Sequence, residues 1–532
     1  MGQMLFYDFI DIFFINVVVP HPFRVDHQHR PLRTAIKTTG GINPHTFLAR
    51  KPQRLHPLLR IVTNLGRTEA LATFTTTVTL ISTKEYMVFK IHGRKDTRET
   101  SEAQREIRAP VIFFFDLLAQ PFTLHNMDKA TFIKEADRCV KCGLCLPHCP
   151  TYQQLQDEGD SPRGRIALMQ GLAQKKLPLS EKLIDHLDRC LVCRACEAMC
   201  PSGVKYGELI ETTRASIINE TDAPDSDRAT GMMQHFVTQP THRRHLSRLL
   251  RVYQSSGLGW LVRHSGLLRP LGLQRLEGVL PKLSSALPTQ HYHPPIGEQK
   301  GEIGLFAGCM GDSLDTATIH AAIRLLTHLG YGVHLPPKQN CCGALHLHRG
   351  DLKQADVLAS ENRNAFSELN IDALIYCASG CGSTLQKLRQ IGRNDAPVME
   401  IGQFLAQAEW PETLALRPLG KQIAIHLPCS LSHVLKQGHA PEALLSRIPG
   451  VKTVPLPDNQ NCCGAAGDYM IRHPEIADEL RDNKLRQLDT MRPDILVSSN
   501  IGCALHIAAG IREVGLKIEV IHPVTLLARQ LP

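Results

Sequence analysis

The placement of cysteine is the feature that most constrains this chain. All seventeen cysteines of the 532 residues lie between Cys139 and Cys503, and most of them stand in short-spaced groups. An odd count in such groups argues against a disulfide framework and for metal ligation, because a metal site needs several thiolates from a short stretch of chain. The composition, 43% apolar and 21% charged, is that of packed domains rather than of a disordered chain.

Length and charge narrow the class of protein further. The length predicts about three or four domains. Of the net charge of +9, residues 1–126 supply +6, from 16 basic and 10 acidic residues, and no base-reading motif accompanies it, so we expect no nucleic-acid partner. The most apolar stretch, Met4–Pro20, is interrupted by Asp8 and Asp11 and lacks the features of a secretory signal. We therefore expect a soluble, cytoplasmic protein.

The pattern C-x2-C-x2-C-x3-C-P occurs twice, beginning at Cys139 and at Cys190. Three closely spaced thiolates can hold three corners of a [4Fe–4S] cluster, and in two-cluster ferredoxins the fourth thiolate comes from the other motif. A zinc ribbon has no use for the third cysteine or for the repeated Cys-Pro. The predicted ligand sets are Cys139, Cys142, Cys145 and Cys200 for the first cluster, and Cys190, Cys193, Cys196 and Cys149 for the second.

Helical patterns fill the sequence between these two motifs. Ser161-Pro162 offers an N-cap and a first-turn proline for a helix over Arg163–Lys176, and Ser180 can cap a second helix that leads to Cys190. The sequence therefore predicts a helical two-cluster ferredoxin domain over residues 127–220.

The remaining cysteines reveal an internal duplication. The first copy has Cys309, Cys341-Cys342-Gly343 and Cys381; the second has Cys429, Cys462-Cys463-Gly464 and Cys503, at offsets of 120, 121 and 122 residues. Short apolar runs before these cysteines, at Ile303–Phe306, Asp372–Tyr376, Ile423–Ile425 and Asp494–Ser498, predict strands, and helical patterns such as Thr318–Leu329 and Ile476–Leu488 lie between them. Two α/β domains result, with the cysteines at the carboxyl ends of parallel strands.

The chemistry of the duplicated cysteines stays open from the sequence. Vicinal thiolates suit an irregular iron–sulfur cluster, a zinc site or a reversible vicinal disulfide, and buried unreactive thiols are the structural alternative. The first copy has an additional thiol, Cys377, where the second has Ser499, so we expect five metal ligands in the first and four in the second. Four histidines lie near these motifs: His346, His348, His426 and His433. Each could ligate metal, but 26 histidines are spread along the chain, so a surface or capping role is favoured for any one of them.

The predicted fold class is a multidomain α+β chain. Residues 1–126 hold 12 of the 17 Phe and no Cys. We expect them to be translated upstream sequence or a poorly ordered extension, with an accessory domain as the alternative; a peptide from this stretch in the mass spectrum of the native protein would exclude translated upstream sequence. A Thr-rich stretch there, Thr73–Thr83, fits a strand with no evident partner. After the ferredoxin domain we expect a helical connector at 221–300 and the duplicated domains at 301–418 and 419–532.

Five short motifs accompany the cysteine pattern within residues 127–532: Ser161-Pro-Arg-Gly-Arg-Ile166, His186-Leu-Asp-Arg-Cys190, Cys200-Pro-Ser-Gly-Val204, Ala378-Ser-Gly-Cys381 and Asn500-Ile-Gly-Cys503. With these motifs, residues 127–532 resemble the iron–sulfur subunit of bacterial glycolate oxidase. Residues 1–126 have no counterpart in that family, and Cys377 departs from its pattern, in which a residue without a thiol is usual.

The resemblance implies an electron-transfer subunit rather than the site of substrate chemistry. It implies a FAD-containing partner subunit that oxidises glycolate or D-lactate, two [4Fe–4S] clusters, a further cluster or zinc in the duplicated domains, and a quinone or other membrane acceptor. The basic, Leu-rich run Arg243–Leu283 could lie on the inner membrane face, although such a run is more often a solvated helix packed on its own protein. The duplicated domains also resemble those of the disulfide-cleaving subunit of heterodisulfide reductase, so the alternative is a catalytic subunit that cleaves a disulfide.

Overall fold

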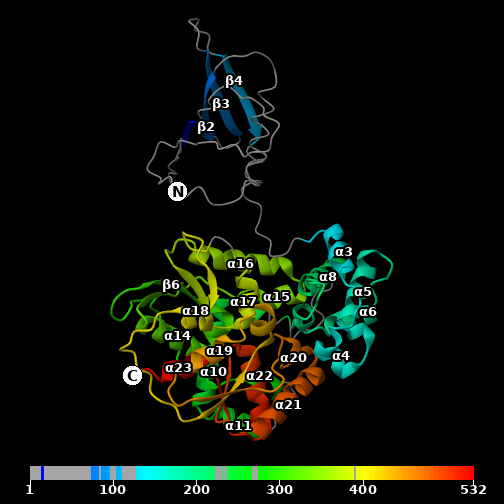
Figure 1. The fold of residues 1–532 in the computed structure, drawn as a ribbon, viewed down its shortest axis with the longest axis vertical. Helices are drawn as coiled ribbons and strands as arrows, with labels where there is room; N and C mark the ends of the chain where they lie inside the picture. Colours follow the sequence, from blue (N-terminus) through cyan, green and yellow to red (C-terminus); the bar gives the residue numbers. More distant parts are fainter. Residues whose placement is uncertain are drawn as a thin grey trace, which may run out of the picture. The chain divides into compact units, whose positions relative to one another are not determined.

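The computed structural model describes residues 127–221, 231, 235–236, 238–265, 274–388 and 391–532, together with four strands of the first 126 residues (Figure 1). The chain divides into two units, Met1–Pro121 and Phe122–Pro532. Each unit is described by itself.

The described part of the first unit is an antiparallel sheet in the order β1-β2-β3-β4. The strand expected at Thr73–Thr83 is present as β2, but the expectation that it lacks a partner is wrong, because β2 pairs with β1 and β3. The rest of the prediction for residues 1–126 lies outside the described residues. The bounds are β1 (Phe13–Asn16), β2 (Phe74–Ser82), β3 (Tyr86–Lys95) and β4 (Ala103–Pro110).

The second unit begins with short helices that carry the two repeated cysteine motifs. The side chains of Asp128, Ser161 and Ser180 accept hydrogen bonds from the first turns of α3, α5 and α6, as N-caps do. The bounds are α3 (Lys129–Asp137), η3 (Leu146–His148), α4 (Pro150–Leu155), η4 (Glu158–Asp160), α5 (Pro162–Ala173), α6 (Glu181–Asp188), α7 (Ala195–Ala198) and α8 (Tyr206–Thr221).

A helical connector follows, with α10 (Pro240–Ser255), α11 (Leu258–Ser265) and α12 (Gln274–Val279). The buried Arg243 of α10 donates from Nη1 to Asn340 Oδ1 at 3.0 Å, and the same oxygen accepts from the backbone N–H of Cys341 at 2.8 Å. The connector therefore holds the loop that carries the first vicinal cysteine pair.

The first duplicated domain is a five-stranded sheet in the order β5-β7-β6-β8-β9, parallel except for β5. Its strands are β5 (Tyr292–His293), β6 (Gly301–Phe306), β7 (Tyr331–His334), β8 (Ala373–Tyr376) and β9 (Val398–Glu400). Its helices are α13 (Gly308–Ser313), α14 (Thr316–His328), α15 (Ala344–Arg349), α16 (Leu352–Phe366), α17 (Ser379–Leu385) and α18 (Ile401–Gln407).

The second duplicated domain has a fully parallel sheet in the order β11-β10-β12-β13. Its strands are β10 (Gln422–His426), β11 (Lys452–Pro455), β12 (Ile495–Ser498) and β13 (Glu519–Ile521). Its helices are η5 (Ser430–Val434), α19 (Ala440–Leu445), α20 (Tyr469–Arg472), α21 (Pro474–Met491), α22 (Ile501–Glu513) and α23 (Pro523–Arg529).

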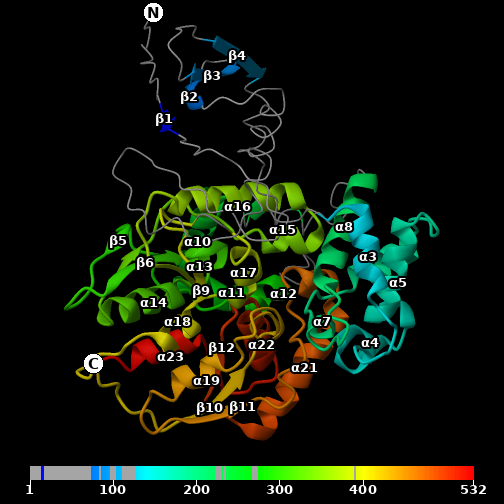
Figure 2. The ribbon, with the colours of Figure 1, turned by 45° about the horizontal axis from the view of Figure 1, so that its top comes forward.

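The two duplicated domains share one hydrophobic core. Ile303 and Leu305 of β6, Ile423 and Ile425 of β10, and Leu527 of α23 belong to the same buried cluster. Figure 2 shows α14, α18, α19 and α23 between the strands of the two domains. The repeat in the sequence predicts two separate domains. Burial of apolar surface between them joins the two into one folded body.

A buried carboxylate joins the ferredoxin helices to the first duplicated domain. Glu211 of α8 is fully buried and lies 3.2 Å from Arg194 Nη2, 2.9 Å from His348 Nδ1 and 3.7 Å from Lys387 Nζ. Burial alone would raise the pKa of Glu211, but the hydrogen bond from His348 and the charges of Arg194 and Lys387 hold that pKa well below its usual value.

A second set of contacts joins the ferredoxin helices to the other duplicated domain. Tyr469 donates from its hydroxyl to Arg189 O at 2.9 Å, and His473 Nε2 lies 2.8 Å from Asp188 Oδ2. The second duplicated domain thus contacts the segment Asp188–Arg194 directly, and the first is joined to Arg194 of that segment through Glu211. The segment contains two cysteines of the second ferredoxin motif.

We predict that Glu211→Gln lowers the free energy of unfolding by about 3 kcal/mol, because it leaves the partly buried cations of Arg194 and Lys387 without their counter-charge. Thermal unfolding of the reconstituted protein under anaerobic conditions measures the change. Glu208→Gln, on the same helix, removes only an exposed ion pair with Lys205 and should change stability by less than about 0.5 kcal/mol. Equal effects of the two substitutions would contradict the role of Glu211.

Candidate iron–sulfur centres

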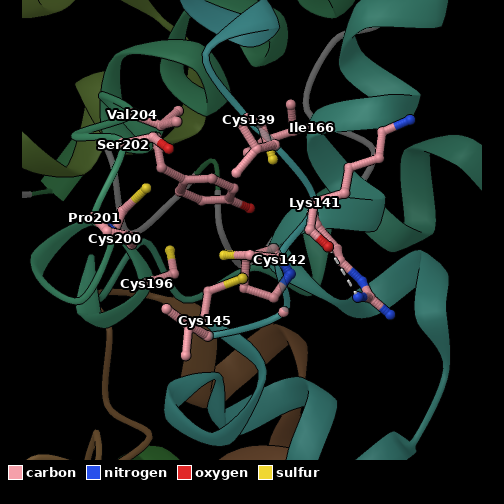
Figure 3. A pocket seen from close by; sticks show the side chains of 16 residues that line it. Cys139, Lys141, Cys142, Cys145, Ile166, Cys196, Cys200, Pro201, Ser202 and Val204 are labelled. Atoms are coloured by element: carbon pink, nitrogen blue, oxygen red, sulfur yellow. Dashed lines mark hydrogen bonds between the residues drawn. The ribbon is translucent and has the colours of Figure 1, made fainter.

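The first ferredoxin motif folds around a small cavity. Figure 3 shows five thiols gathered around it, from Cys139, Cys142, Cys145, Cys196 and Cys200. The loop turns tightly because Lys141 and Gly143 adopt positive φ angles of 56° and 84°, and Arg163 donates from Nη1 to Lys141 O at 3.3 Å. Four of the five thiols are the set predicted for the first cluster.

A second cavity lies beside the second motif, and its lining includes the set predicted for the second cluster, Cys149, Cys190, Cys193 and Cys196. Cys200 lines only the first of these two cavities and Cys149 only the second. Each fourth cysteine thus lies with the other motif, which is the placement that the crossed ligand sets require.

Arg165 and Tyr206, two buried groups that the sequence did not reveal as part of the site, line the second cavity. Arg165 is 1% exposed; its guanidinium lies 4.0 Å from Cys149 Sγ and donates to Thr151 Oγ1 at 2.9 Å and to Asp160 Oδ1 at 3.0 Å. The hydroxyl of Tyr206 donates to Cys190 Sγ at 3.4 Å. A buried cation and a hydroxyl donor both stabilise thiolate charge. The Ser161-Pro-Arg-Gly-Arg motif contains Arg165 but does not reveal its contact with a cysteine.

A third and larger cavity, of about 370 Å³, lies between the two duplicated domains. Cysteines at the carboxyl ends of both sheets line it, four from each domain: Cys309, Cys341, Cys342 and Cys381, and Cys429, Cys462, Cys463 and Cys503. The glycine after each vicinal pair is required by a close approach: Gly343 has φ 83°, and a Cβ there would lie 3.2 Å from Ala355 O.

The thiols within each set of four touch in series. In the first domain Cys341 contacts Cys309 and Cys342, and Cys342 contacts Cys381. In the second domain the Sγ atoms of Cys429 and Cys462 are 3.9 Å apart. All seventeen cysteines are free thiols, and two converging sets of four soft donors fit iron or zinc.

Cys377 does not line the large cavity that these eight thiols share. Its side chain belongs to the core shared by the two domains, together with Ala373 and Ile375, whereas Leu374 and Tyr376 face the cluster that contains Cys309 and the vicinal pair. Side chains alternate between the two faces of a strand, and this alternation, continued one residue past β8, directs Cys377 away from the large cavity. Cys377 instead lines a separate small cavity together with Cys381.

Three of the four histidines near the motifs have partners elsewhere. His346 Nδ1 lies 2.9 Å from Asp351 Oδ2, His348 Nδ1 lies 2.9 Å from Glu211 Oε1, and His433 donates from Nε2 to Gln460 O at 2.9 Å. His426 differs, since a ring nitrogen of its buried side chain and the Sγ atoms of Cys463 and Cys503 all lie within 4.8 Å of one another.

The three cavities form a continuous series. Cys196 and Tyr206 line both the first and the second cavity, and Cys190 and Leu191 line both the second and the third. Burial raises the pKa of Cys145 to about 11 and also raises the pKa of Cys193 well above its usual value. Metal binding reverses this preference for the protonated thiol, because a bound cation favours the thiolate.

We predict that Cys200→Ser alters the cluster held by Cys139, Cys142 and Cys145, because Cys200 lines their cavity although it belongs to the second motif. Electron paramagnetic resonance of the reduced protein should show one cubane signal changed and the other retained. Cys149→Ser should produce the reciprocal result. The crossed ligand sets would be contradicted if Cys200→Ser changed only the cluster held by Cys190, Cys193 and Cys196.

We predict that Cys377→Ala leaves the iron content and the visible spectrum unchanged, because this thiol packs in the apolar core. It should cost about 1 kcal/mol of stability through the small void that it creates. Cys381→Ala, which removes a thiol that lines the large cavity, is the matched control and should reduce the metal content. Loss of metal in Cys377→Ala would contradict this prediction and support five thiolate ligands in the first domain.

Comparison with known protein families matches the ferredoxin helices, the connector and both duplicated domains. Residues 135–204 match the 4Fe-4S dicluster domain, and residues 303–386 and 423–508 each match the cysteine-rich domain. Residues 229–280 match the linker region of the glycolate oxidase iron-sulfur subunit.

Full-length relatives agree with these matches. The chain is 35% identical over 411 residues to a probable glycolate oxidase iron-sulfur subunit of Bacillus subtilis, and 35% identical over 400 residues to that of Escherichia coli; these alignments cover 73% and 72% of this chain and 92% of each relative. It is 25% identical to one subunit of a dihydromethanophenazine-dependent heterodisulfide reductase of Methanosarcina barkeri, over 72% of this chain and 90% of that protein. The chain therefore belongs to the glycolate oxidase iron–sulfur subunit family and is an oxidoreductase iron–sulfur subunit.

Proposed function

We propose that this chain carries electrons from a FAD-containing subunit that oxidises glycolate or D-lactate toward the quinone pool. The observation that supports the proposal most strongly is the series of three thiol-lined cavities, in which neighbouring cavities share lining residues. A relay needs such sites in succession, whereas a scaffold stapled by metal does not.

The substrate chemistry is assigned to a partner. No Gly-x-Gly-x-x-Gly follows a strand in the sequence, so the usual fingerprint of a dinucleotide-binding strand–turn–helix is missing. The names of two relatives describe iron–sulfur subunits of glycolate oxidase, and another relative is named a lactate utilization protein. These names support a 2-hydroxy acid as the electron source.

In this proposal the chain's residues bind the cofactors and set their charge. The crossed cysteine sets hold two [4Fe–4S] clusters, and the eight thiols of the duplicated domains hold further iron–sulfur clusters or zinc. Iron–sulfur clusters supply one-electron transfer when bound. Arg165 places a buried positive charge beside Cys149, and Tyr206 donates to Cys190, so both favour the reduced, more negative state of the second site.

We predict that glycolate or D-lactate bleaches the visible iron–sulfur absorption of the native complex, purified anaerobically with its flavoprotein. The acid that causes bleaching identifies the electron source. Dithionite is the control that shows intact, reducible clusters. Reduction by dithionite without bleaching by either acid would contradict the proposed electron source.

A disulfide-cleaving role is the second candidate. All eight thiols of the duplicated domains line one cavity, and a relative at 25% identity is named a heterodisulfide reductase subunit. The same purified complex separates the two candidates: reoxidation of the dithionite-reduced protein by an added disulfide, with release of two thiols, would favour cleavage over relay.

We further propose that helices α10 and α11 dock on an anionic membrane surface. Leu249 and Val252 on α10 and Trp260 on α11 are 67%, 64% and 66% exposed, and Arg248 and His245 are exposed beside them on α10. Between Asp227 and Glu277 the sequence has eight arginines and no acidic residue. Exposed apolar side chains mixed with basic ones are typical of helices that bind anionic bilayer surfaces. Among the described residues, no helix is long and apolar enough to cross a membrane.

We predict that the protein floats with vesicles that contain phosphatidylglycerol, and floats less with pure phosphatidylcholine or at high salt, where charge is screened. Leu249→Ser/Val252→Ser should weaken binding by at least about tenfold, since two apolar side chains lose their burial in lipid. Val357→Ser/Val514→Ser, which changes two exposed valines elsewhere, is the matched control. In a Trp410→Phe background the fluorescence of Trp260 should shift to the blue on binding. If Leu249→Ser/Val252→Ser no longer binds the flavoprotein but still binds vesicles, this face is the contact with the partner instead.

A further inference from the structure

The two duplicated domains differ at three buried positions beside their cysteines. Phe306 and His426 are equivalent, because Phe306 ends β6 and pairs with Tyr376 at the end of β8, and His426 ends β10 and pairs with Ser498 at the end of β12. Asn362 on α16 corresponds to Lys484 on α21, and Cys377 corresponds to Ser499. The second domain thus has an imidazole and an ammonium group where the first has a phenyl ring and an amide.

His426 is placed as a metal ligand would be. It is 1% exposed, and a ring nitrogen, Cys463 Sγ and Cys503 Sγ lie within 4.8 Å of one another. Its Nδ1 lies 3.0 Å from Ser498 Oγ, and among the described residues no hydrogen bond involves Nε2. A partner on one ring nitrogen, with the other nitrogen directed to the metal, is the usual arrangement of a ligating histidine.

Lys484 supplies an independent observation of charge. Its side chain is 1% exposed, and Nζ donates to Asp458 O at 2.6 Å. Within the described part of the chain no carboxylate lies within ion-pair distance of it; the negative groups that act on it, besides Asp458, are the thiols of Cys462, Cys463 and Cys503. Lys484 therefore places a buried basic side chain beside Cys462, Cys463 and Cys503, where thiolates bound to a metal would compensate its charge.

At the equivalent positions the first domain has an apolar and a neutral residue. Phe306 packs there in the apolar cluster that includes Cys309. Asn362 donates to Cys341 O at 2.7 Å and accepts from the backbone N–H of Asn340 at 2.8 Å, so it positions the loop as a neutral group. The buried side chains of Arg243 and His346 act on Cys309 and Cys341 from other positions. At the equivalent positions the domains therefore differ in donor type and in charge.

We propose that the second duplicated domain holds a mixed nitrogen–sulfur metal centre, an iron or zinc ion bound by His426, Cys463 and Cys503, whereas the site of the first domain has only sulfur ligands. The fourth ligand is a neighbouring thiol, and Cys462 adjoins Cys463 and Cys429. Imidazole and thiolate together suit both metals. The proposal rests on the metal-binding role of the duplicated cysteines and not on the identity of the hydroxy acid.

An imidazole ligand would affect electron flow, because this centre lies next to the ferredoxin. Cys193 of the second ferredoxin motif packs with Cys429 and Cys462 in one cluster, so the second domain adjoins the ferredoxin. Replacement of a thiolate by a neutral imidazole removes one negative charge from a centre, and in iron–sulfur proteins this exchange raises the reduction potential. If iron occupies the site, it is then a better electron acceptor than an all-thiolate site would be.

The test uses the full chain, isolated anaerobically, in wild-type form and as His426→Phe, which installs the residue of the first domain. If the metal is iron, pulsed electron paramagnetic resonance of the wild type should show a strongly coupled imidazole nitrogen that the variant lacks. If it is zinc, X-ray absorption should count one nitrogen among the zinc ligands, and the variant should lose at least half of its zinc. His433→Phe, which changes a partly exposed histidine bonded to Gln460 O, should retain both signals.

His426→Cys keeps a soft ligand at the same position and guards against a variant that fails to fold. It should retain the metal, lose the nitrogen signal and, with iron, titrate at a lower potential. A wild-type protein without a nitrogen ligand, without metal in the second domain, or with a nitrogen signal that survives in His426→Phe would overturn the proposal. Bleaching by glycolate or D-lactate would persist in that case, so failure here is distinct from failure of the proposed relay.

Discussion

The buried carboxylate of Glu211 is the interaction on which the geometry of the relay depends. It lies between Arg194, next to Cys193 in the second ferredoxin motif, and His348 and Lys387 of the first duplicated domain. An ion pair removed from water contributes little net stability, but it penalises every arrangement in which its members separate. Glu211 therefore fixes where one group of thiols sits relative to the next.

The sequence predicted well wherever spacing along the chain determines geometry. The offsets of the repeated cysteines identified the two α/β domains, and the capping residues Ser161 and Ser180 marked helices that the structure contains. Counting cysteines groups Cys377 with the four thiols of the first domain, whereas the alternation of side chains over residues 373–377 places it on the face away from the large cavity. The partner strands of β2 were missed for lack of a clear pattern beside it.

Tertiary contacts account for what the sequence did not reveal. Arg165 and Glu211 appear as ordinary charged residues of helices, and only the folded chain shows that both are buried against the cysteine loops. His426 was one of four histidines near the motifs, and nothing in its spacing separates it from His433. At equivalent positions the first repeat has Phe306 and Asn362 and the second has His426 and Lys484. The two repeats therefore differ chemically, although each contributes four thiols to the lining of the cavity.

The shared core of the duplicated domains has a consequence for how the protein is made. Eight thiols line a space between two sheets whose helices pack into one apolar cluster, so the same folding event that completes the core also brings these thiols together. Inorganic iron, sulfide or zinc therefore meets a complete set of ligands only once the two halves have packed. Maturation in the cell then has an order, in which folding of the shared core comes before full ligation of the metal.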